Sequence, residues 1–187
     1  MSELSQYRET KDQYFAHSAS SPLTLRQRQS FSRLDYYPEN PDLRMVIKIE
    51  EFPDDIKQAI EMATTTGDFQ CKVAWGKCSF EVNGESVSLT VYQRAEADGF
   101  FLPFFDSTTG QETYGGGRYL DVLPLEDGWF LVDFNFAFNP YCAYNSSWSC
   151  VLPPSENRLG VPIRAGEKNF AGKRLAREQM QQEKHAA

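Results

Sequence analysis

The sequence predicts a mainly β protein of the α+β kind: an antiparallel β barrel, roll or sandwich with N-terminal helices and a C-terminal helix. The first observation is an alternation of apolar and polar residues, typical of strands with one buried face. It occurs in four stretches, at residues 45–50, 69–75, 78–83 and 86–91. The second is Asn83-Gly84, a strong signal for a two-residue hairpin turn. The third is the content of 14 Phe, 9 Tyr and 3 Trp residues, which supplies a sizeable core.

Helices are expected before the strands. Apolar side chains recur at helical spacing over residues 3–17, which predicts a first helix. A second helix that ends near Leu34 is expected to start either at Ser21-Pro22 or at Thr24, which with Gln27 has the spacing of a capping box. The length of 187 residues suits one domain. We therefore expect a helical extension, a single β-rich domain and a helical tail that frays, over residues 1–20, 21–170 and 171–187.

Turn and strand signals continue through the middle of the chain. Trp75-Gly76-Lys77 predicts another tight turn, and Glu126-Asp127-Gly128 predicts a hairpin turn. Residues 129–134 are apolar on both faces except for Asp133, which predicts a central strand. The segment over residues 92–148 holds 15 of the aromatic residues and many amides, which is unusual for surface loops.

The charge of the chain limits its partners. The formal net charge is −7, and phosphate backbones need a basic face, so we expect no nucleic-acid partner. No apolar stretch approaches the ~20 residues of a membrane helix, so we expect no membrane partner. The first residues lack the pattern of a signal peptide, which predicts a cytoplasmic protein. The sequence leaves the oligomeric state open.

Histidine is scarce, which limits the chemistry. The two histidines, His17 and His185, both lie in terminal segments. Histidine is the usual proton shuttle and a common metal ligand near neutral pH, so we expect neither a histidine-based triad nor a metal site. Catalysis would therefore depend on carboxylate, Arg, Tyr, Lys or Cys side chains.

The four cysteines do not have the spacing of a zinc site. Cys71 and Cys78 lie in the alternating stretches, and we expect both to fill the core. Cys142 and Cys150 flank a polar, aromatic loop, where they are either two free thiols or a disulfide. Thiol chemistry at Cys142 would need a nearby positive charge to lower its pKa.

Several polar residues stand in aromatic surroundings, and each has two interpretations. Asp133 is either a buried acid or base, or a structural residue that caps the following loop or pairs with an Arg. Gly115-Gly116-Gly117-Arg118 is either a nest for an anionic group, or a turn whose Arg118 pairs with Asp106 or Asp121. Asparagine amides in this region bind a polar ligand or stabilise irregular loops.

From these residues we select a candidate site. The candidate catalytic residues are Asp133, Cys142 and Glu156. The candidate ligand-binding residues are Tyr114, Gly116, Arg118, Asn135, Asn139, Tyr144, Asn157 and Arg158. Glu156 and Arg158 lie in a Pro-rich segment that either closes over a pocket or joins parts of the domain through ion pairs.

The same region resembles a known family. The motifs are residues 101–104, 113–120, 133–135, 139–145, 152–159 and 163–168. In this order they resemble domain-of-unknown-function family 1684, a family of uncharacterised, mainly prokaryotic proteins; residues 22–91 are similar to it more loosely. Val151 departs from the family pattern, which has a proline there. The resemblance implies no established activity, and it marks the polar residues selected above.

Two functions remain open. The first is a β domain that binds a small anionic molecule. If Asp133 moves a proton, this domain is an enzyme with a histidine-free site. The second is a structural or interaction module whose polar cluster is an internal hydrogen-bond network. The cofactor is unknown, and a flavin site follows only by fold analogy with split barrels.

Overall fold

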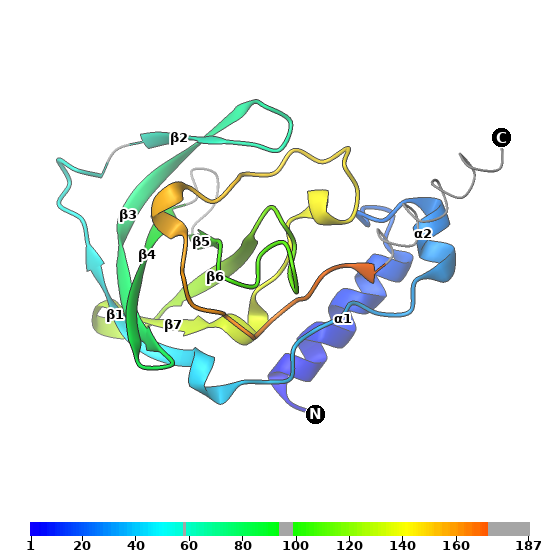
Figure 1. Cartoon of the computed structure of the whole chain (residues 1–187), viewed down its shortest axis with the longest axis horizontal. Coiled ribbons are helices and arrows are strands. Elements are labelled where there is room, and N and C mark those ends of the chain that lie inside the picture. The colour runs from blue at the N-terminus through cyan, green and yellow to red at the C-terminus, as the bar shows by residue number, and fades with distance from the viewer. Residues whose placement is uncertain (58, 94–98, 172–187) are drawn as a thin grey trace.

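A closed antiparallel barrel forms the centre of the molecule (Figure 1). The computed structural model describes residues 1–57, 59–93 and 99–171. Six strands run around the barrel in the order β1-β7-β6-β5-β4-β3, and β3 pairs back with β1. Their bounds are β1 Arg44–Glu51, β3 Phe69–Val82, β4 Glu85–Gln93, β5 Phe100–Phe104, β6 Arg118–Pro124 and β7 Trp129–Asp133. The prediction of a mainly β fold is confirmed, and the architecture is the barrel.

A further strand, β2 (Ala59–Ala63), extends the sheet beyond the barrel. It pairs with the first residues of β3, from Phe69 to Val73. Cys71 lies on this extension and is exposed, so the expectation that it fills the core is wrong. Cys78 lies further along β3, inside the barrel, and is fully buried.

The predicted turn at residues 75–77 is also wrong. β3 continues through this segment, and a bulge between Ala74 and Gly76 shifts its register with β4. Gly76 pairs with Glu51 of β1, and a Cβ at Gly76 would lie 2.7 Å from the Glu50 carbonyl oxygen. The glycine therefore allows β1 to approach β3 and close the barrel.

Both predicted hairpin turns are confirmed. Asn83 and Gly84 have φ angles of 52° and 80°, the left-handed pair that a two-residue turn requires, and they join β3 to β4. Asp127 and Gly128, with φ angles of 54° and 75°, turn the chain between β6 and β7. β7 lies between β1 and β6 as expected of a central strand, although Trp129 on its outer face is exposed.

Apolar side chains fill the barrel interior. Its most deeply buried members include Leu89, Val91, Leu102, Phe104, Leu120, Val132 and Phe134. Small barrels of this kind have interiors that side chains can fill. The interior is therefore a packed core.

Two helices lie together at one side of the barrel (Figure 1). α1 (Glu3–His17) begins after the N-cap Ser2. α2 (Leu25–Ser30) begins with the predicted capping box, but it ends before Leu34. The residues after α2 are extended, because Leu34 packs with Phe15 in a second core and its N–H donates to Asp12.

Short 3₁₀ helices occupy several connections. They are η1 Pro41–Leu43, η2 Glu126–Gly128, η3 Phe134–Phe136, η4 Tyr141–Ala143 and η5 Ser155–Asn157. The expected C-terminal tail over residues 171–187 lies, apart from Ala171, outside the described residues. Within the described part of the chain, no helix is long and apolar enough to cross a membrane.

Candidate functional site

Arg118, at the start of β6, lies inside the protein with 1% of its surface exposed. Its Nη2 donates to the Ile163 carbonyl at 2.7 Å and lies 3.3 Å from Oδ2 of Asp106. Its Nη1 donates to the carbonyls of Ala165 and Glu167. These donors hold residues 163–167 against the barrel. The sequence allowed Arg118 to pair with either Asp106 or Asp121, and the structure shows the pair with Asp106.

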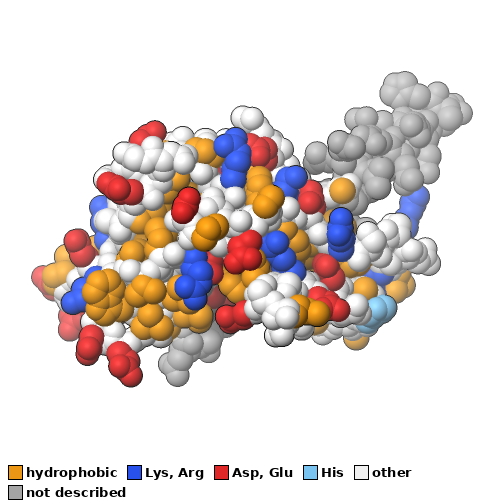
Figure 2. Space-filling view, turned by 90° about the horizontal axis from the view of Figure 1, so that it is seen from below, with side chains coloured by type: hydrophobic (Ala, Val, Ile, Leu, Met, Phe, Trp, Pro, Cys, Tyr) orange, Lys and Arg blue, Asp and Glu red, His pale blue; other side chains and the backbone are white. Residues whose placement is uncertain are grey.

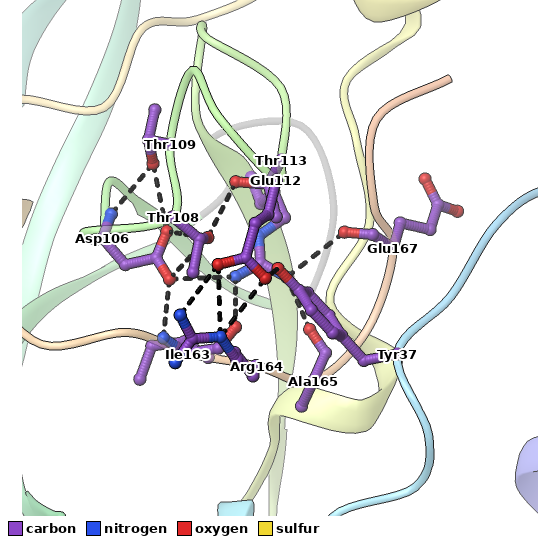
Figure 3. Close-up of polar contacts among 11 residues, drawn as sticks. Tyr37, Asp106, Thr108, Thr109, Glu112, Thr113, Ile163, Arg164, Ala165 and Glu167 are labelled. Carbon is purple, nitrogen blue, oxygen red and sulfur yellow. Dashed lines mark hydrogen bonds and ion pairs between the residues drawn. The ribbon is translucent and has the colours of Figure 1, made fainter. Parts of the chain in front are cut away.

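Asp106 is enclosed in the same way. Its Oδ2 accepts from the Ile163 N–H at 2.6 Å, and its Oδ1 accepts from the Thr108 hydroxyl at 2.8 Å. Figure 3 shows these groups directed at one another, with Glu112 and Arg164 beside them. Glu112 and Arg164 form a more exposed ion pair, with 2.8 Å between Oε1 and Nη2.

The glycine segment before β6 is a tightly packed turn. Gly117 has a φ of +82°, and a Cβ there would lie 2.7 Å from Pro153 and 2.8 Å from the Phe104 carbonyl oxygen. Gly116 lies against the ring of Tyr114, whose hydroxyl donates to Sγ of Cys142 at 3.6 Å. Only a glycine at 117 lets the Pro-rich segment approach the barrel this closely.

Asp133 and Asn135 lie together at the end of β7. Oδ1 of Asp133 accepts from the backbone N–H of Asn135 at 3.0 Å and from its amide at 2.8 Å. Asn135 also exchanges hydrogen bonds of 2.8 and 2.9 Å with the backbone of Asn40. Nε of Arg44 lies 3.3 Å from Oδ2 of Asp133. The aspartate thus caps η3 and fixes the segment before β1.

Asn157 joins β4 to β5 where their own pairing is short. Among the described residues, β4 and β5 pair at Tyr92–Phe101 and Gln93–Phe100. The Asn157 amide accepts from the Thr90 N–H at 2.7 Å and donates to the carbonyls of Thr90 and Pro103 at 2.8 and 2.7 Å. The side chain thereby supplies the cross-strand hydrogen bonds that the two strands lack here.

The neighbours of Asn157 have partners of their own. Glu156 accepts from the hydroxyl of Tyr92 at 2.8 Å, and burial together with this carboxylate raises the pKa of Tyr92. The Arg158 guanidinium stacks over the ring of Phe105, 4.2 Å from its centre. Glu156 and Arg158 are therefore directed at different parts of the surface.

A buried carboxylate, Glu167, organises a further polar cluster. It accepts from the ammonium of Lys11 on α1, from the hydroxyl of Tyr144 and, at 2.9 Å, from the backbone N–H of Asn139. Burial and the nearby carboxylate raise the pKa of Tyr144. Burial acts to lower the pKa of Lys11, but the charges and hydrogen bonds of Glu167 and Tyr7 together outweigh burial and raise the pKa. These contacts fasten α1 to the barrel.

The structure thus distributes the predicted residues over several places. Three groups of predicted residues lie together: Asp133 with Asn135, Asn139 with Tyr144, and Tyr114 with Gly116 and Cys142. Arg118 binds Asp106 in a separate place, and the run of Glu156, Asn157 and Arg158 lies apart from both. The first functional hypothesis has Arg118 and the preceding glycines hold an anion and Asp133 move a proton; in the structure, Arg118 binds Asp106 and three backbone carbonyls, and Asp133 binds Asn135 and Arg44. Their polar atoms mostly bind the protein's own backbone.

A pocket with a volume of about 270 Å³ opens on the outer side of the barrel. It lies between β3, the strands β5 and β6, and the loop over residues 138–151. The lining residues are Gln70, Lys72, Phe101, Tyr119, Phe138, Asn139, Pro140, Tyr141, Trp148, Ser149, Cys150 and Val151. Of the residues selected from the sequence, Asn139 is the one that lines this pocket.

Five of the twelve residues that line the pocket are aromatic. Phe101 and Tyr119 stand edge to face on β5 and β6, with 4.7 Å between their ring centres. Phe138 lies 5.9 Å from Tyr119. Tyr141 and Trp148, on opposite arms of the loop, pack edge to face at 5.0 Å. Rings arranged in this way offer flat apolar faces to a ligand.

Tyr119 holds both ends of the loop. Its backbone N–H and carbonyl each form a 2.9 Å hydrogen bond with Phe138. Its hydroxyl donates to the carbonyl of Val151 at the other end. The Val151 end is also joined to β2, because Leu152 N–H donates to the Ala63 carbonyl at 2.8 Å. The loop is therefore anchored to two strands at its base.

Lys72 supplies the charge of the pocket. The residues that line the pocket include this one cation and no carboxylate or histidine. No described carboxylate lies within salt-bridge distance of Lys72. The side chain projects from β3, on the face that also carries Gln70. The lining is thus suited to an anionic group beside aromatic rings.

The two loop cysteines are free thiols. The backbone N–H of Cys142 donates to Sγ of Cys150 at 3.3 Å. Contact with the Cys142 side chain, together with burial, raises the pKa of Cys150. A thiol in this state is a poor nucleophile at neutral pH, because the thiolate is the reactive form.

Among the described residues, no group of three or more His, Cys, Asp and Glu side chains could hold a metal ion.

Comparison with known proteins identifies the family. Residues 29–168 match the family described as "Protein of unknown function (DUF1684)". The chain belongs to this family. The DUF1684 protein is also 34% identical to an uncharacterized protein from gene locus rrnAC0354 of Haloarcula marismortui, solved by solution NMR. The two structures agree with a TM-score of 0.69 over 89% of this chain and 92% of that one. No curated protein matches the chain.

Sequence reasoning missed most of the pocket of this DUF1684 protein. Lys72 occupies an ordinary polar position in an alternating strand, and nothing local distinguishes it from Lys77. The concentration of aromatic residues over 92–148 did signal the correct region, since Phe101, Tyr119 and Trp148 come from it. The local sequence does not show that β3 lies beside the loop over residues 138–151, which is what brings Lys72 to the pocket.

Proposed function

We propose that this DUF1684 protein binds a small, planar, anionic molecule in the pocket beside Lys72. The observation that carries the proposal is the composition of the lining: five aromatic side chains, one ammonium group and no carboxylate among the described residues. A volume of about 270 Å³ is slightly below the ~300 Å³ at which pockets for drug-sized ligands begin, so the ligand is small.

Binding fits this lining better than acid–base catalysis. Catalysts of that kind need a group whose pKa lies near the working pH, most often His, Glu or Asp. The described lining has none of these, the pKa of Cys150 is raised, and burial together with a hydrogen bond to Tyr14 raises the pKa of Tyr141 to about 12. We therefore place the protein among binding proteins.

The probes for the test are 2-naphthoate and the neutral 2-naphthalenemethanol, which share one ring system. Isothermal titration calorimetry gives the affinities, and the indole N–H resonance of Trp148 reports binding in this pocket. We expect 2-naphthoate to bind more tightly than the alcohol. Lys72→Met should remove that difference, about 2- to 5-fold, because a partly exposed ion pair contributes up to about 1 kcal/mol.

Lys77→Met is the matched control, since Lys77 lies on the same strand outside the pocket. It should leave both affinities unchanged. The proposal is wrong if neither probe moves the Trp148 resonance at millimolar concentration. It is also wrong if Lys72→Met and Lys77→Met change the affinity for 2-naphthoate equally.

A further inference from the structure

A second feature lies on the outer face of β1, β7 and β6, away from the pocket. The strand register places Val46, Leu131 and Leu123 side by side in one row across the three strands. The next row contains Trp129, which pairs with Lys48 on one side and bonds to the Leu125 N–H on the other. We call these apolar residues, Val46, Leu123, Leu125, Trp129 and Leu131, the outer-face patch.

The patch is exposed to an unusual degree. The exposed fractions are 50% for Val46, 53% for Leu123, 48% for Leu125 and 42% for Trp129. Figure 2 shows apolar side chains gathered on the part of this surface that lies over β1 and β7. Single exposed apolar residues need no explanation, but a contiguous group ringed by charges is characteristic of an interaction site.

Charges on the two sides of the patch have opposite signs. Arg44 and Lys48 lie on β1, with outward-facing side chains. Arg44 is paired with Asp133 of β7, so Lys48 supplies the net positive charge of this strand beside the patch. Asp121 on β6 and Glu126 and Asp127 in the following turn lie on the other side.

Glu50, an acidic residue at the far end of β1, is paired in register with Lys77 of β3. The β1 side of the patch is therefore basic, and the β6 side is acidic.

We infer that the outer-face patch binds a second copy of this chain through a two-fold axis parallel to the strands. Such an axis lays β1 over the β6 of the other copy and β7 over its β7. Lys48 then faces the partner subunit's Glu126, and the same contact occurs twice, as the two-fold axis requires. Stacked sheets prefer this nearly aligned arrangement of strands.

The charge pattern selects this axis over the alternative. A two-fold axis across the strands would lay β1 on β1, so that the basic side chains of both copies would meet. Like charges placed together at an interface cost several kcal/mol, whereas complementary charges fix the register. The aligned axis buries the apolar rows of both copies and joins basic to acidic sides.

The experiment is sedimentation velocity of the full chain over a concentration series. We expect a species with twice the chain mass of 21.4 kDa. Leu123→Lys should make the protein monomeric. Leu25→Lys is the matched control, because Leu25 is 74% exposed on α2 and lies outside the patch, so this variant should remain dimeric.

A charge exchange tests the orientation. Lys48→Glu and Glu126→Lys should each weaken self-association about tenfold or more, because each places like charges together twice. An equimolar mixture of the two variants should restore the dimer, because both contacts then join opposite charges. Circular dichroism and thermal melting confirm that each variant is folded.

Three results would overturn the inference. The first is a wild-type protein that stays monomeric, or forms a larger oligomer, over the whole concentration series. The second is a Leu123→Lys variant that associates as strongly as the Leu25→Lys control. The third is a mixture of Lys48→Glu and Glu126→Lys proteins that associates no better than either alone. None of them bears on the pocket, whose test uses different residues.

Discussion

Replacing Asp106 by asparagine should destabilise the protein strongly, because it leaves the charge of Arg118 buried without a counter-ion. The change keeps the shape of the side chain, and the amide oxygen can still accept one of the hydrogen bonds at that position. Arg118 and Asp106 side chains are each 1% exposed, so neither charge is solvated by water. Breaking a buried ion pair by removing one partner typically costs about 3–5 kcal/mol.

That loss is a large part of the ~5–15 kcal/mol that stabilises an ordinary domain. Urea unfolding followed by circular dichroism measures it directly. With a slope of about 2 kcal/mol/M, the midpoint should fall by about 1.5–2.5 M. The slope itself should not change, since the folded state stays compact.

Glu112→Gln is the matched control in the same part of the structure. Glu112 also pairs with an arginine, Arg164, but these two side chains are 38% and 56% exposed. An exposed pair contributes about 0–1 kcal/mol, so the midpoint should fall by less than about 0.5 M. The reasoning is refuted if Asp106→Asn and Glu112→Gln shift the midpoint by similar amounts.

Two further predictions concern stability. Asn157→Ala removes three buried hydrogen bonds and should cost about 3 kcal/mol, lowering the melting temperature by about 6–12 °C, whereas Asn145→Ala, at a partly exposed loop position, should leave it nearly unchanged. Equal effects in calorimetry would contradict this role for Asn157. The raised pKa of Tyr144 keeps its hydroxyl protonated in the folded state, while the unfolded tyrosine ionises near its ordinary pKa of 10.0. Stability present below about pH 10 should therefore be lost as the pH rises further, and a urea midpoint that is the same at about pH 9 and about pH 11 would contradict this.

Local patterns predicted β1, β3, β4 and β7 and two of the turns because those signals are contained within a few residues, whereas β2, β5 and β6 were not predicted as strands. Asn83 and Gly84 need positive φ angles wherever they lie, so the turn follows from their identity. Gly76 has a different reason to be a glycine: the approach of Glu50, which is distant in sequence. A reader of the local sequence interprets Gly76 as a turn, because the closing contact with β1 is not visible there.

The candidate site shows the same division. Arg118 and Asn157 were singled out as polar residues, and Asp106 was one of the two partners expected for Arg118. Their other partners, the carbonyls of Ile163 and Pro103, are backbone groups that no sequence pattern identifies. Lys72 was not singled out, since a lysine in an alternating strand usually faces water. Sequence reasoning thus finds unusual residues more readily than it finds the surfaces they share.

The anchoring of the loop over residues 138–151 has a consequence for how proteins with this fold diversify. Tyr119 and the end of β2 hold its base, and Tyr144 buries its middle, whereas residues 145–149 carry no comparable buried anchor. Trp148 belongs to this tip and lines the pocket. Substitutions at the tip can therefore reshape the wall of the pocket in related proteins while the barrel stays unchanged.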